Sequence, residues 1–400
     1  MVLRDKSVVL GVTGSIAAYK AADLASKLTQ AGAAVDVVMT RAATEFIAPL
    51  TFRSITHRPV SSSMFNAPTE YEIEHIALAE RADVIAIAPA TADIIARLAA
   101  GIADDLLCCT VLATRAPVIL APAMNVNMWE NPITQENLER LRARGFRVVE
   151  PGYGAMACGA TGAGRLADTE RILGTIQQVL GSGGDLAGKC VVVTAGGTQE
   201  PIDPVRHIGN RSSGKMGYAL AEAARDRGAE VTLISAPTSL AEPVGVETVH
   251  VQTALEMRQA VLDAVSTADV LIMAAAVADY RPANAGKTKI KKESAADMTL
   301  ELVRTPDILS EVKGGLVKVG FAAESEDLVK NAVAKLKEKG LDLIVANDIT
   351  AADSGFDVDT NRVVLIDGKG NQEELPLLPK PGVAHRILDR VADILAAKKM

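Results

Sequence analysis

Three segments in the first half of the chain carry side chains suited to proton transfer or carboxylate binding. His75 follows a run of alternating glutamates, and nearby carboxylates keep an imidazole basic near neutral pH, as a proton acceptor requires. Cys158 lies in a glycine-rich segment ahead of Arg165, where a thiol can exchange a proton and a loop can close over a substrate. Taken alone, His75 is better explained as a solvated loop histidine, so a catalytic role for it depends on the other motifs.

The third segment is Pro122-Ala-Met-Asn125, which directly follows an apolar run and therefore falls at the carboxyl edge of a sheet, where ligands bind. A separate turn, Gly14-Ser15, places backbone N–H groups and a hydroxyl at the start of a helix, which is a natural cradle for phosphate. Because the turn is not Gly-x-Gly-x-x-Gly, it favours a mononucleotide such as FMN over a dinucleotide. A tight turn without a ligand explains Gly14-Ser15 equally well.

The second half contains a segment, residues 209–216, that is nearly a P-loop. Met216 stands where the Ser or Thr that reaches Mg²⁺ belongs, so a P-loop is disfavoured. Asp279 follows the apolar run 270–274 and has the chemistry to hold Mg²⁺ or a ribose hydroxyl, although a simple turn aspartate is an equal alternative.

Lysines in two patterns could serve polyanion binding. Lys287, Lys289 and Lys291 alternate along a predicted strand and so share one face, which is also how edge strands are protected from aggregation. Lys335 and Lys339 are four residues apart in a helical pattern, so both could reach a triphosphate. The alternative for this second pair is an ordinary solvated helix face.

The elements that must position these residues form two successive α/β patterns. In the first, apolar runs predict strands and longer periodic segments predict helices: strands 8–12, 35–39, 84–88 and 118–121, and helices 16–31 and 92–100. The small residues 181–184 predict a flexible connection. The pattern then restarts: strands 190–194, 231–234 and 270–274, a helix 216–227, and a capping box at Thr253 and Glu256 that opens another helix.

We therefore predict two doubly wound, mainly parallel-sheet α/β domains, residues 1–184 and 185–400. An echo links them: Ala82-Asp-Val-Ile in the first half matches Ala268-Asp-Val-Leu in the second. Chance explains the echo too, because any parallel strand entered from a helix has a similar pattern.

Composition excludes several classes of protein. The chain is 48% hydrophobic and 23% charged, which rules out a wholly disordered protein. A net charge of −7 and only 3% aromatic residues argue against a binder of nucleic acid or anionic membranes. Four cysteines in 400 residues form no disulfide framework, and Cys108 and Cys109 lie in an apolar helical run as packing residues. With no apolar run of transmembrane length, a cytoplasmic protein is expected.

Taken together, these motifs resemble a known family. His75, Pro122 to Asn125 and the Cys158 loop are similar to the flavin-dependent cysteine decarboxylases. Their order and spacing resemble the bacterial bifunctional phosphopantothenoylcysteine decarboxylase/phosphopantothenate–cysteine ligases of coenzyme A biosynthesis. The ligase half of that family is matched by segments 196–203, 210–216, 275–282 and 289–292. The resemblance spans essentially the whole chain.

For the first half, the resemblance implies a flavodoxin-like domain that binds FMN at a subunit interface. It implies that His75 is the base of an oxidative decarboxylation, that Asn125 binds the substrate carboxylate, and that Cys158 protonates the enethiol intermediate. The FMN contacts it implies are Gly14, Ser15, Ile16, Ala17 and Thr40. The protein is then expected to be a homo-oligomer.

For the second half, the resemblance implies a Rossmann-like domain that activates 4′-phosphopantothenate with CTP and Mg²⁺ to an acyl-cytidylate, which cysteine then attacks. Asn210 would hold the acyl-cytidylate, Lys289 would assist its formation, and Asp279 would bind CTP and the metal. The other implied nucleotide contacts are Met273, Ala274, Ala275, Pro306, Asp307, Ile308, Leu309, Phe321, Lys335 and Lys339. CTP rather than ATP rests on the resemblance alone.

Two other functions compete with this reading. A flavodoxin-like carrier fused to a nicotinamide-binding oxidoreductase is disfavoured, because no Gly-x-Gly-x-x-Gly follows Thr194. A flavin-storing assembly protein gives no purpose to His75 and Cys158 together. The sequence therefore predicts an enzyme that acts on small molecules, with neither nucleic acid nor membrane as a partner.

Overall fold

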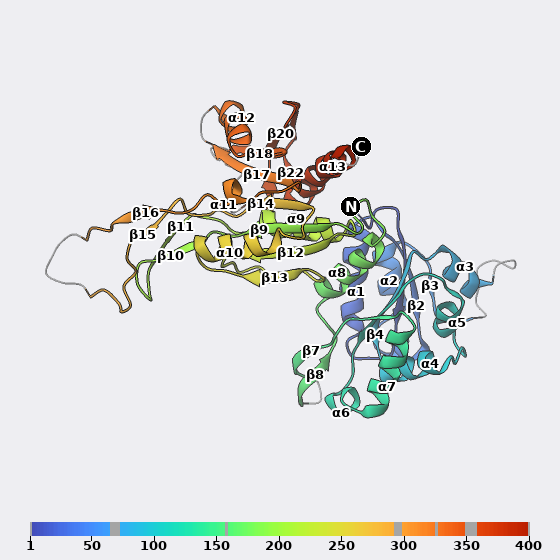
Figure 1. The fold of residues 1–400 in the computed structure, drawn as a ribbon. Coiled ribbons are helices and arrows are strands. Elements are labelled where there is room, and N and C mark those ends of the chain that lie inside the picture. Colours follow the sequence, from blue (N-terminus) through green and yellow to red (C-terminus); the bar gives the residue numbers. More distant parts are fainter. Residues whose placement is uncertain are drawn as a thin grey trace. The chain divides into compact units, whose positions relative to one another are not determined.

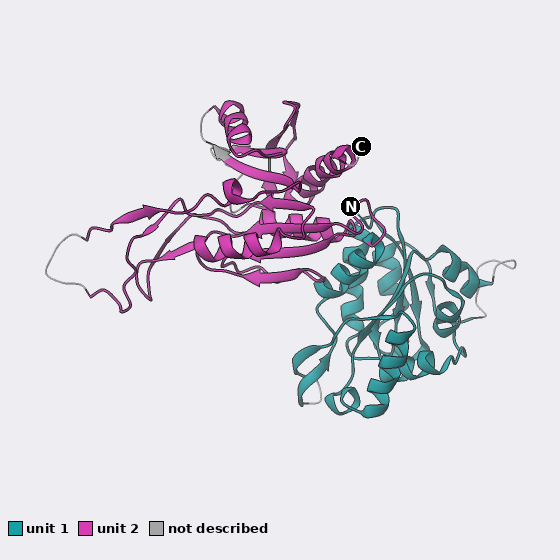
Figure 2. Ribbon diagram, viewed as in Figure 1, with its two compact units in different colours: residues 1–181 teal, residues 182–400 magenta. Residues whose placement is uncertain are grey.

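The computed structural model describes residues 2–64, 73–156, 159–291, 298–324, 327–348 and 358–398. The chain divides into two compact units, Met1–Gly181 and Ser182–Met400 (Figure 2). Each unit has its own mainly parallel sheet covered by helices, which confirms the predicted α/β fold class (Figure 1). In the described part of the chain, no helix combines the length and the apolar character needed to cross a bilayer.

The first unit contains a six-stranded parallel sheet in the order β3-β2-β1-β4-β5-β6. Without the two-residue edge strand β3, this order is that of flavodoxin; with it, the order is that of a dinucleotide-binding sheet. The strands are β1 (Ser7–Val12), β2 (Ala34–Met39), β3 (Val60–Ser61), β4 (Val84–Ala90), β5 (Val118–Pro122) and β6 (Arg147–Val148). An antiparallel hairpin, β7 (Gly152–Ala155) and β8 (Thr161–Arg165), follows the sheet.

Helices cover both faces of this sheet, and each strand contributes alternate side chains to two cores. Val8 and Leu10 pack with α1, α2 and α8, whereas Val9 packs with α3, α4, α5 and α7. The helices are α1 (Ala18–Gln30), α2 (Pro49–Thr56), α3 (Glu74–Arg81), α4 (Ala92–Ala100), α5 (Leu106–Ala113), α6 (Val126–Trp129), α7 (Pro132–Ala143), α8 (Thr169–Gly181) and the 3₁₀ helix η1 (Arg41–Glu45).

The second unit contains an eight-stranded sheet in the order β13-β12-β9-β14-β17-β18-β20-β21, antiparallel only where β20 joins β18 and β21. Its strands are β9 (Cys190–Ala195), β12 (Glu230–Ser235), β13 (Glu247–His250), β14 (Val270–Met273), β17 (Val317–Glu324), β18 (Leu343–Asp348), β20 (Val363–Asp367) and β21 (Gln372–Glu374). Three small antiparallel pairs lie outside the sheet: β10 (Gln199–Pro201) with β11 (His207–Gly209), β15 (Tyr280–Pro282) with β16 (Leu302–Arg304), and β19 (Thr360–Asn361) with β22 (Leu378–Pro379).

The helices of this unit again form two layers: α9 (Lys215–Arg225) and α13 (Lys380–Lys398) on one face, and α10 (Ala254–Ala264), α11 (Ile308–Glu311) and α12 (Leu328–Glu338) on the other. The predicted capping box opens α10. The hydroxyl of Thr253 accepts the amide of Glu256 at 3.2 Å, and the Glu256 carboxylate accepts the amide of Thr253 at 3.2 Å.

At the amino edges of the two sheets, an aspartate makes the same contacts in both units. Asp83, just before β4, accepts the amide of Ser7 at 2.8 Å and pairs with the ammonium of Lys6 at 3.0 Å. Asp269, just before β14, accepts the amide of Cys190, the first residue of β9, at 2.9 Å and pairs with the ammonium of Lys189. The echo in the sequence therefore corresponds to a shared arrangement of strand, lysine and aspartate.

Two sequence expectations about local structure are wrong. Residues 287–291 form no strand, because the amide of Ile290 binds the carboxylate of Asp203 instead of a neighbouring strand. Residues 181–184 are the end of α8 and a hydrogen-bonded turn rather than a free connection. Gly184 lies directly against the chain at Arg227, where a Cβ on residue 184 would be 2.5 Å from the Arg227 carbonyl oxygen. The small residue is there for close packing.

Candidate functional site

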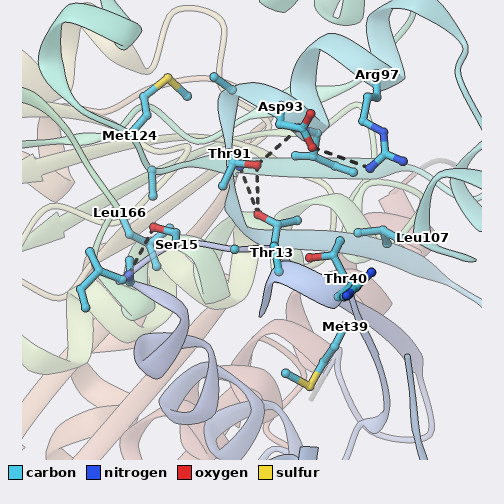
Figure 3. Close-up of a pocket in the computed structure, with 18 of the residues that line it drawn as sticks. Thr13, Ser15, Met39, Thr40, Thr91, Asp93, Arg97, Leu107, Met124 and Leu166 are labelled. Carbon is cyan, nitrogen blue, oxygen red and sulfur yellow. Dashed lines mark hydrogen bonds and ion pairs between the residues drawn. The ribbon is translucent and has the colours of Figure 1, made fainter. Parts of the chain in front are cut away.

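The first unit has a cavity of about 1090 Å³ at the carboxyl ends of its central strands, where the strand order reverses between β1 and β4 (Figure 3). This is the position at which doubly wound sheets bind ligands. All five residues expected to contact FMN line this cavity: Gly14, Ser15, Ile16, Ala17 and Thr40.

Threonine hydroxyls fix the floor of the cavity. Thr13, which is buried, donates to the carbonyl of Pro89 at 2.7 Å and accepts the amide of Thr91 at 3.2 Å. Thr91 in turn caps α4 by accepting the amide of Ile94 at 3.4 Å. Figure 3 shows the hydroxyls of Thr13 and Thr91 facing each other across the end of β1. The turn after β1 is therefore attached to the turn after β4.

The Gly14 turn suits a phosphate-bearing cofactor. The N-cap residue of α1 is Ala17, and the turn before the helix is closed by Ser15, whose hydroxyl accepts the amide of Ala17 at 3.3 Å and whose carbonyl accepts the amide of Ala18 at 2.9 Å. This places the Ser15 hydroxyl and the positive end of the helix dipole at the cavity. Gly14 packs closely on the segment after β2, because a Cβ on residue 14 would be 2.5 Å from the Cβ of Ala42. A side chain at this position would move one wall of the cavity. These features fit a flavin mononucleotide.

Asn125 also lines the cavity, at the start of α6, where its side-chain oxygen accepts the amide of Asn127 at 2.8 Å. The hairpin β7–β8 packs against this segment, and the amide of Met124 donates to the carbonyl of Gly164 at 2.9 Å. Gly164 has a φ of +136°, and a Cβ there would be 2.4 Å from the Met124 carbonyl oxygen. The structure thus brings Asn125 to the predicted cofactor site, whereas Cys158 lies outside the described residues.

His75 is not among the residues that line this cavity. It lies half-buried in the first turn of α3, and α3 is anchored at both ends. Its Glu74 accepts a hydrogen bond from the hydroxyl of Ser61, and its Arg81 pairs with the buried carboxylate of Asp36 at 3.1 Å. Asn125 therefore lines the cavity within one chain, and His75 does not.

Acidic residues form one wall of the same cavity, which was not predicted from the sequence. Arg97 pairs with Asp93 at 3.7 Å, with Asp105 at 2.8 Å and also with Asp104. In the described part of the chain, Asp104, Asp105 and Cys108 are the one group of three side chains close enough to share a metal ion. Arg97 already pairs with both carboxylates of this group, and burial, with Asp105 beside it, raises the pKa of the Cys108 thiol to about 12. Cys108 is thus a packing residue, as predicted.

The second unit has a smaller cavity, of about 460 Å³, at the carboxyl ends of β14 and β17. It gathers most of the residues expected to bind nucleotide: Met273, Ala275, Asp279, Pro306, Asp307, Ile308, Leu309, Phe321, Lys335 and Lys339. Of that set, Ala274 and Lys289 do not line it. Tyr280 and Arg304 line it but were missed, because both belong to the short pair β15–β16, which has no clear periodic signal.

The two cavity lysines already have partners. Lys335 donates to the carbonyl of Phe321 at 2.7 Å, and Lys339 pairs with Asp307 at 3.0 Å. Partial burial alone would raise the pKa of Asp307, but the hydroxyl of Ser310 and the ammonium of Lys339 together bring that pKa below its ordinary value. Both lysines lie on one side of the cavity, as their spacing along the helix predicts.

Buried threonines hold the loop that carries Asp279. The hydroxyl of Thr194 accepts the amide of Ala275 at 3.1 Å, and that of Thr198 accepts the amide of Ala278 at 2.9 Å. Asn210 donates to the carbonyl of Val277 at 3.0 Å, so its side chain contacts a residue of the cavity wall. Within the described residues, Asp279 is not part of a group of three potential metal ligands.

Comparisons with known proteins cover both units. Residues 2–181 match the family described as Flavoprotein, and residues 186–395 match the DNA/pantothenate metabolism flavoprotein C-terminal domain. The coenzyme A biosynthesis bifunctional protein CoaBC of Bacillus subtilis is 47% identical over 396 residues, which is 98% of this chain and 97% of that protein. The protein of the same name from Mycobacterium tuberculosis is 45% identical over 410 residues, again 98% and 97% of the two chains. A crystal structure of the C-terminal domain of a CoaBC protein is 42% identical, with a TM-score of 0.46, and covers 53% of this chain and 98% of that one.

Proposed function

This chain belongs to the family of coenzyme A biosynthesis bifunctional proteins, and on that premise we propose how its two activities are divided between its units. The protein is an enzyme with decarboxylase and ligase activities. The unit Ser182–Met400 would ligate 4′-phosphopantothenate to cysteine with CTP. The unit Met1–Gly181 would then decarboxylate 4′-phosphopantothenoylcysteine to 4′-phosphopantetheine with FMN.

The observation that carries the ligase assignment is the cavity at β14 and β17. Asp279 and the distant pair Lys335 and Lys339 line one space together with residues 306–309. A carboxylate is a poor electrophile, so its oxygen would attack the α-phosphate of CTP and release pyrophosphate. The amine of cysteine would then attack the acyl carbon, and CMP would leave. Cations next to the phosphates stabilise the charge that develops in the first step.

Each ligase residue would contribute in a distinct way. Lys335 and Lys339 would turn from their present partners to the triphosphate, and Lys289 would assist formation of the acyl-cytidylate. Asn210, which contacts the cavity wall through Val277, would hold that intermediate. Mg²⁺ would be shared between the nucleotide phosphates and Asp279, because Asp279 alone offers too few ligands for the ion.

The decarboxylase assignment is supported by the cavity at the switch point of the first sheet. Loss of CO₂ needs an acceptor for the electron pair left on carbon, and bound FMN would supply the two-electron redox chemistry that creates one next to the substrate sulfur. Asn125 would hold the substrate carboxylate at the cavity wall. His75 would remove a proton, and Cys158 would return one.

The position of His75 supports a homo-oligomeric enzyme. Within one chain, α3 is held by contacts with Ser61 and Asp36, and His75 is not among the residues that line the flavin cavity. A second copy of the chain would have to bring its own His75 to that site. This agrees with a flavin bound at a subunit interface.

Nucleotide competition tests the ligase proposal. The full-length protein is given phosphopantothenate, cysteine and Mg²⁺ with CTP or ATP, and pyrophosphate and CO₂ are measured in the same reaction. We expect both products with CTP, far less pyrophosphate with ATP, and none after chelation of Mg²⁺. Equal pyrophosphate release with ATP would contradict the assignment of CTP.

A further inference from the structure

Asp203 has more hydrogen-bond partners than the turn that contains it requires. It lies between β10 and β11, in the part of the second unit that extends beyond the main sheet together with β15 and β16 (Figure 1). One carboxylate oxygen accepts the amides of Val205 and Arg206 at 2.8 and 2.9 Å, which is enough to close the turn. The side chain is fully buried although the four residues after it are exposed.

The second carboxylate oxygen of Asp203 is directed to a distant segment. It accepts the amide of Ile290 at 3.1 Å, and the guanidinium of Arg206 donates to it at 2.5 and 3.0 Å. The same guanidinium donates to the carbonyl of Ile290 at 2.9 Å. Both polar backbone groups of Ile290 are therefore bound by this aspartate–arginine pair.

A third hydrogen bond holds the start of the same segment. The amide of Gly286 donates to the carbonyl of Ile202 at 2.8 Å. Residues 286–290 are thus attached at both ends to the turn between β10 and β11. Between the two attachments lies Lys289, whose exposed side chain belongs to a stretch without a helix or a strand. Without these attachments, no regular element would hold the backbone of Lys289.

The charge on Asp203 makes this attachment persistent. The Arg206 guanidinium, and then the amides of Val205, Ile290 and Arg206, hold the pKa of the Asp203 carboxyl well below its ordinary value. The group is therefore ionised at any pH at which the enzyme would be assayed. Hydrogen bonds to an ionised acceptor are stronger than those between neutral groups.

We infer that Asp203 is a positioning residue that fixes the Lys289 backbone for nucleotide activation in the ligase reaction. This inference rests on the proposed function, because it assumes that the Lys289 ammonium acts on the triphosphate. A lysine has a long, flexible side chain, so the place of its Cα decides which phosphate oxygens the ammonium can reach. Displacement of a catalytic group by about 1 Å can cost about 100-fold in rate.

The test uses the full-length variant Asp203→Asn and two measurements. Asparagine can still close the turn through its one carbonyl oxygen, but it cannot also accept from Ile290 and Arg206. We expect trypsin to cleave after Lys289 about 10-fold faster, since local opening exposes this segment. We also expect kcat for pyrophosphate release to fall by about 10- to 100-fold, with a smaller change in KM for CTP.

Asp367→Asn is the matched control. Asp367 likewise accepts two turn amides, those of Lys369 and Asn371, and pairs with Arg390 at 3.0 Å, but it lies at the end of β20. This variant should leave both measurements at wild-type values. Release of CO₂ from phosphopantothenoylcysteine should be unchanged in both variants, which shows that the other unit is intact.

The outcomes separate this inference from the proposed function. Faster cleavage with unchanged pyrophosphate release would overturn the inference, as would slower release with unchanged cleavage or no change in either. If Asp203→Asn fails to fold, Arg206→Gln removes the guanidinium that binds both Asp203 and the carbonyl of Ile290, leaves the Lys289–Ile290 bond open to trypsin, and carries the same expectations. Lys289→Gln is assayed in parallel: normal pyrophosphate release there would refute the role of Lys289 itself, whatever Asp203→Asn does.

Discussion

The two units share a framework at the amino edges of their sheets and differ at the carboxyl edges. Asp83 and Asp269 bind the first amide of the adjacent strand and the lysine before it in the same way. Asp342, just before β18, makes a related contact within the second sheet, where it accepts the amide of Lys318, the second residue of β17, at 2.8 Å and pairs with Lys398 of α13 at 2.9 Å. This aspartate is a general way of starting a parallel strand and carries no information about function.

At the carboxyl edges, buried threonines make matching hydrogen bonds in the two units. Thr13 accepts the amide of Thr91 after β4, and Thr194 accepts the amide of Ala275 after β14. The loops beyond these threonines then diverge. The first unit opens a wide cavity lined by a glycine turn, and the second a smaller one lined by lysines and Asp279. On the proposed division of activities, one framework would serve two chemistries, and the loops after the strands would decide which.

The largest expected effect is on CO₂ release, the activity that we assign to the first unit. His75→Asn should lower CO₂ release from phosphopantothenoylcysteine by about 100- to 10 000-fold, because it removes a general base. Pyrophosphate release from CTP should stay at the wild-type rate. Unchanged CO₂ release would rule out His75 as the base, and a loss of both activities would show that the two units do not work independently.

Lys289→Gln makes the reciprocal test in the second unit. Loss of one cation from a developing phosphate charge should slow pyrophosphate release by about 100- to 1000-fold. Decarboxylation of supplied phosphopantothenoylcysteine should be unaffected, which CO₂ measurements check. Lys287→Gln, in the same segment, is the control and should retain most of the ligase activity.

Gly14→Ala should affect only the flavin site. The added Cβ would come within 2.5 Å of Ala42, so the turn or the segment after β2 must move. Such overpacking costs about 1–3 kcal/mol, and we expect about 10-fold weaker retention of FMN, measured by flavin absorbance after dialysis. Gly183→Ala is the control, because a Cβ there has no neighbour within 4 Å. Full flavin retention in Gly14→Ala would contradict a close-packed cradle.

The smallest effect concerns the shared framework. Asp83→Asn should destabilise the first unit by about 1 kcal/mol, a value kept low because Asp83 and Lys6 are partly exposed. The single tryptophan, Trp129, lies in the first unit, so its fluorescence during urea unfolding reports on that unit. Asp269→Asn should leave the tryptophan transition in place. An equal shift in both variants would show that the two units unfold together.

The stability effect of Asp83→Asn should also depend on pH. Burial alone would raise the pKa of Asp83, but the amide of Ser7 and the ammonium of Lys6 lower it below its ordinary value. A carboxyl whose pKa is lower in the folded state stabilises that state above its unfolded pKa of about 4 and loses this contribution as the pH falls further. The stability difference between wild type and Asp83→Asn should therefore be full at pH 7 and shrink below pH 4.

The central strands could be predicted because burial on both faces gives continuous apolar runs. The run 84–88 corresponds to β4, and the helix predicted at 92–100 matches α4, which Thr91 caps. Short pairs such as β10–β11 and β15–β16 could not be predicted, because three-residue strands have no measurable period. The alternating lysines at 287–291 misled for a related reason: alternation does not reveal whether the backbone pairs with a strand or with an aspartate.

The sites show the same limit. The family resemblance assigned residues 14–17 and Thr40 to one FMN site, and the structure places all of them in one cavity where the strand order reverses. The position of α3 depends in part on the ion pair between Arg81 and Asp36, for which the sequence gives no signal. The location of His75 relative to Asn125 could therefore not be derived from spacing.

The ion pair between Lys339 and Asp307 has a consequence for turnover. An internal counter-ion already neutralises this lysine, so the cavity carries less uncompensated positive charge than its lysines suggest. In the proposed ligase reaction, the triphosphate would compete with a carboxylate that never diffuses away. The same carboxylate would bind the ammonium again once pyrophosphate forms, which would weaken the attraction for a strongly charged leaving group and favour its departure.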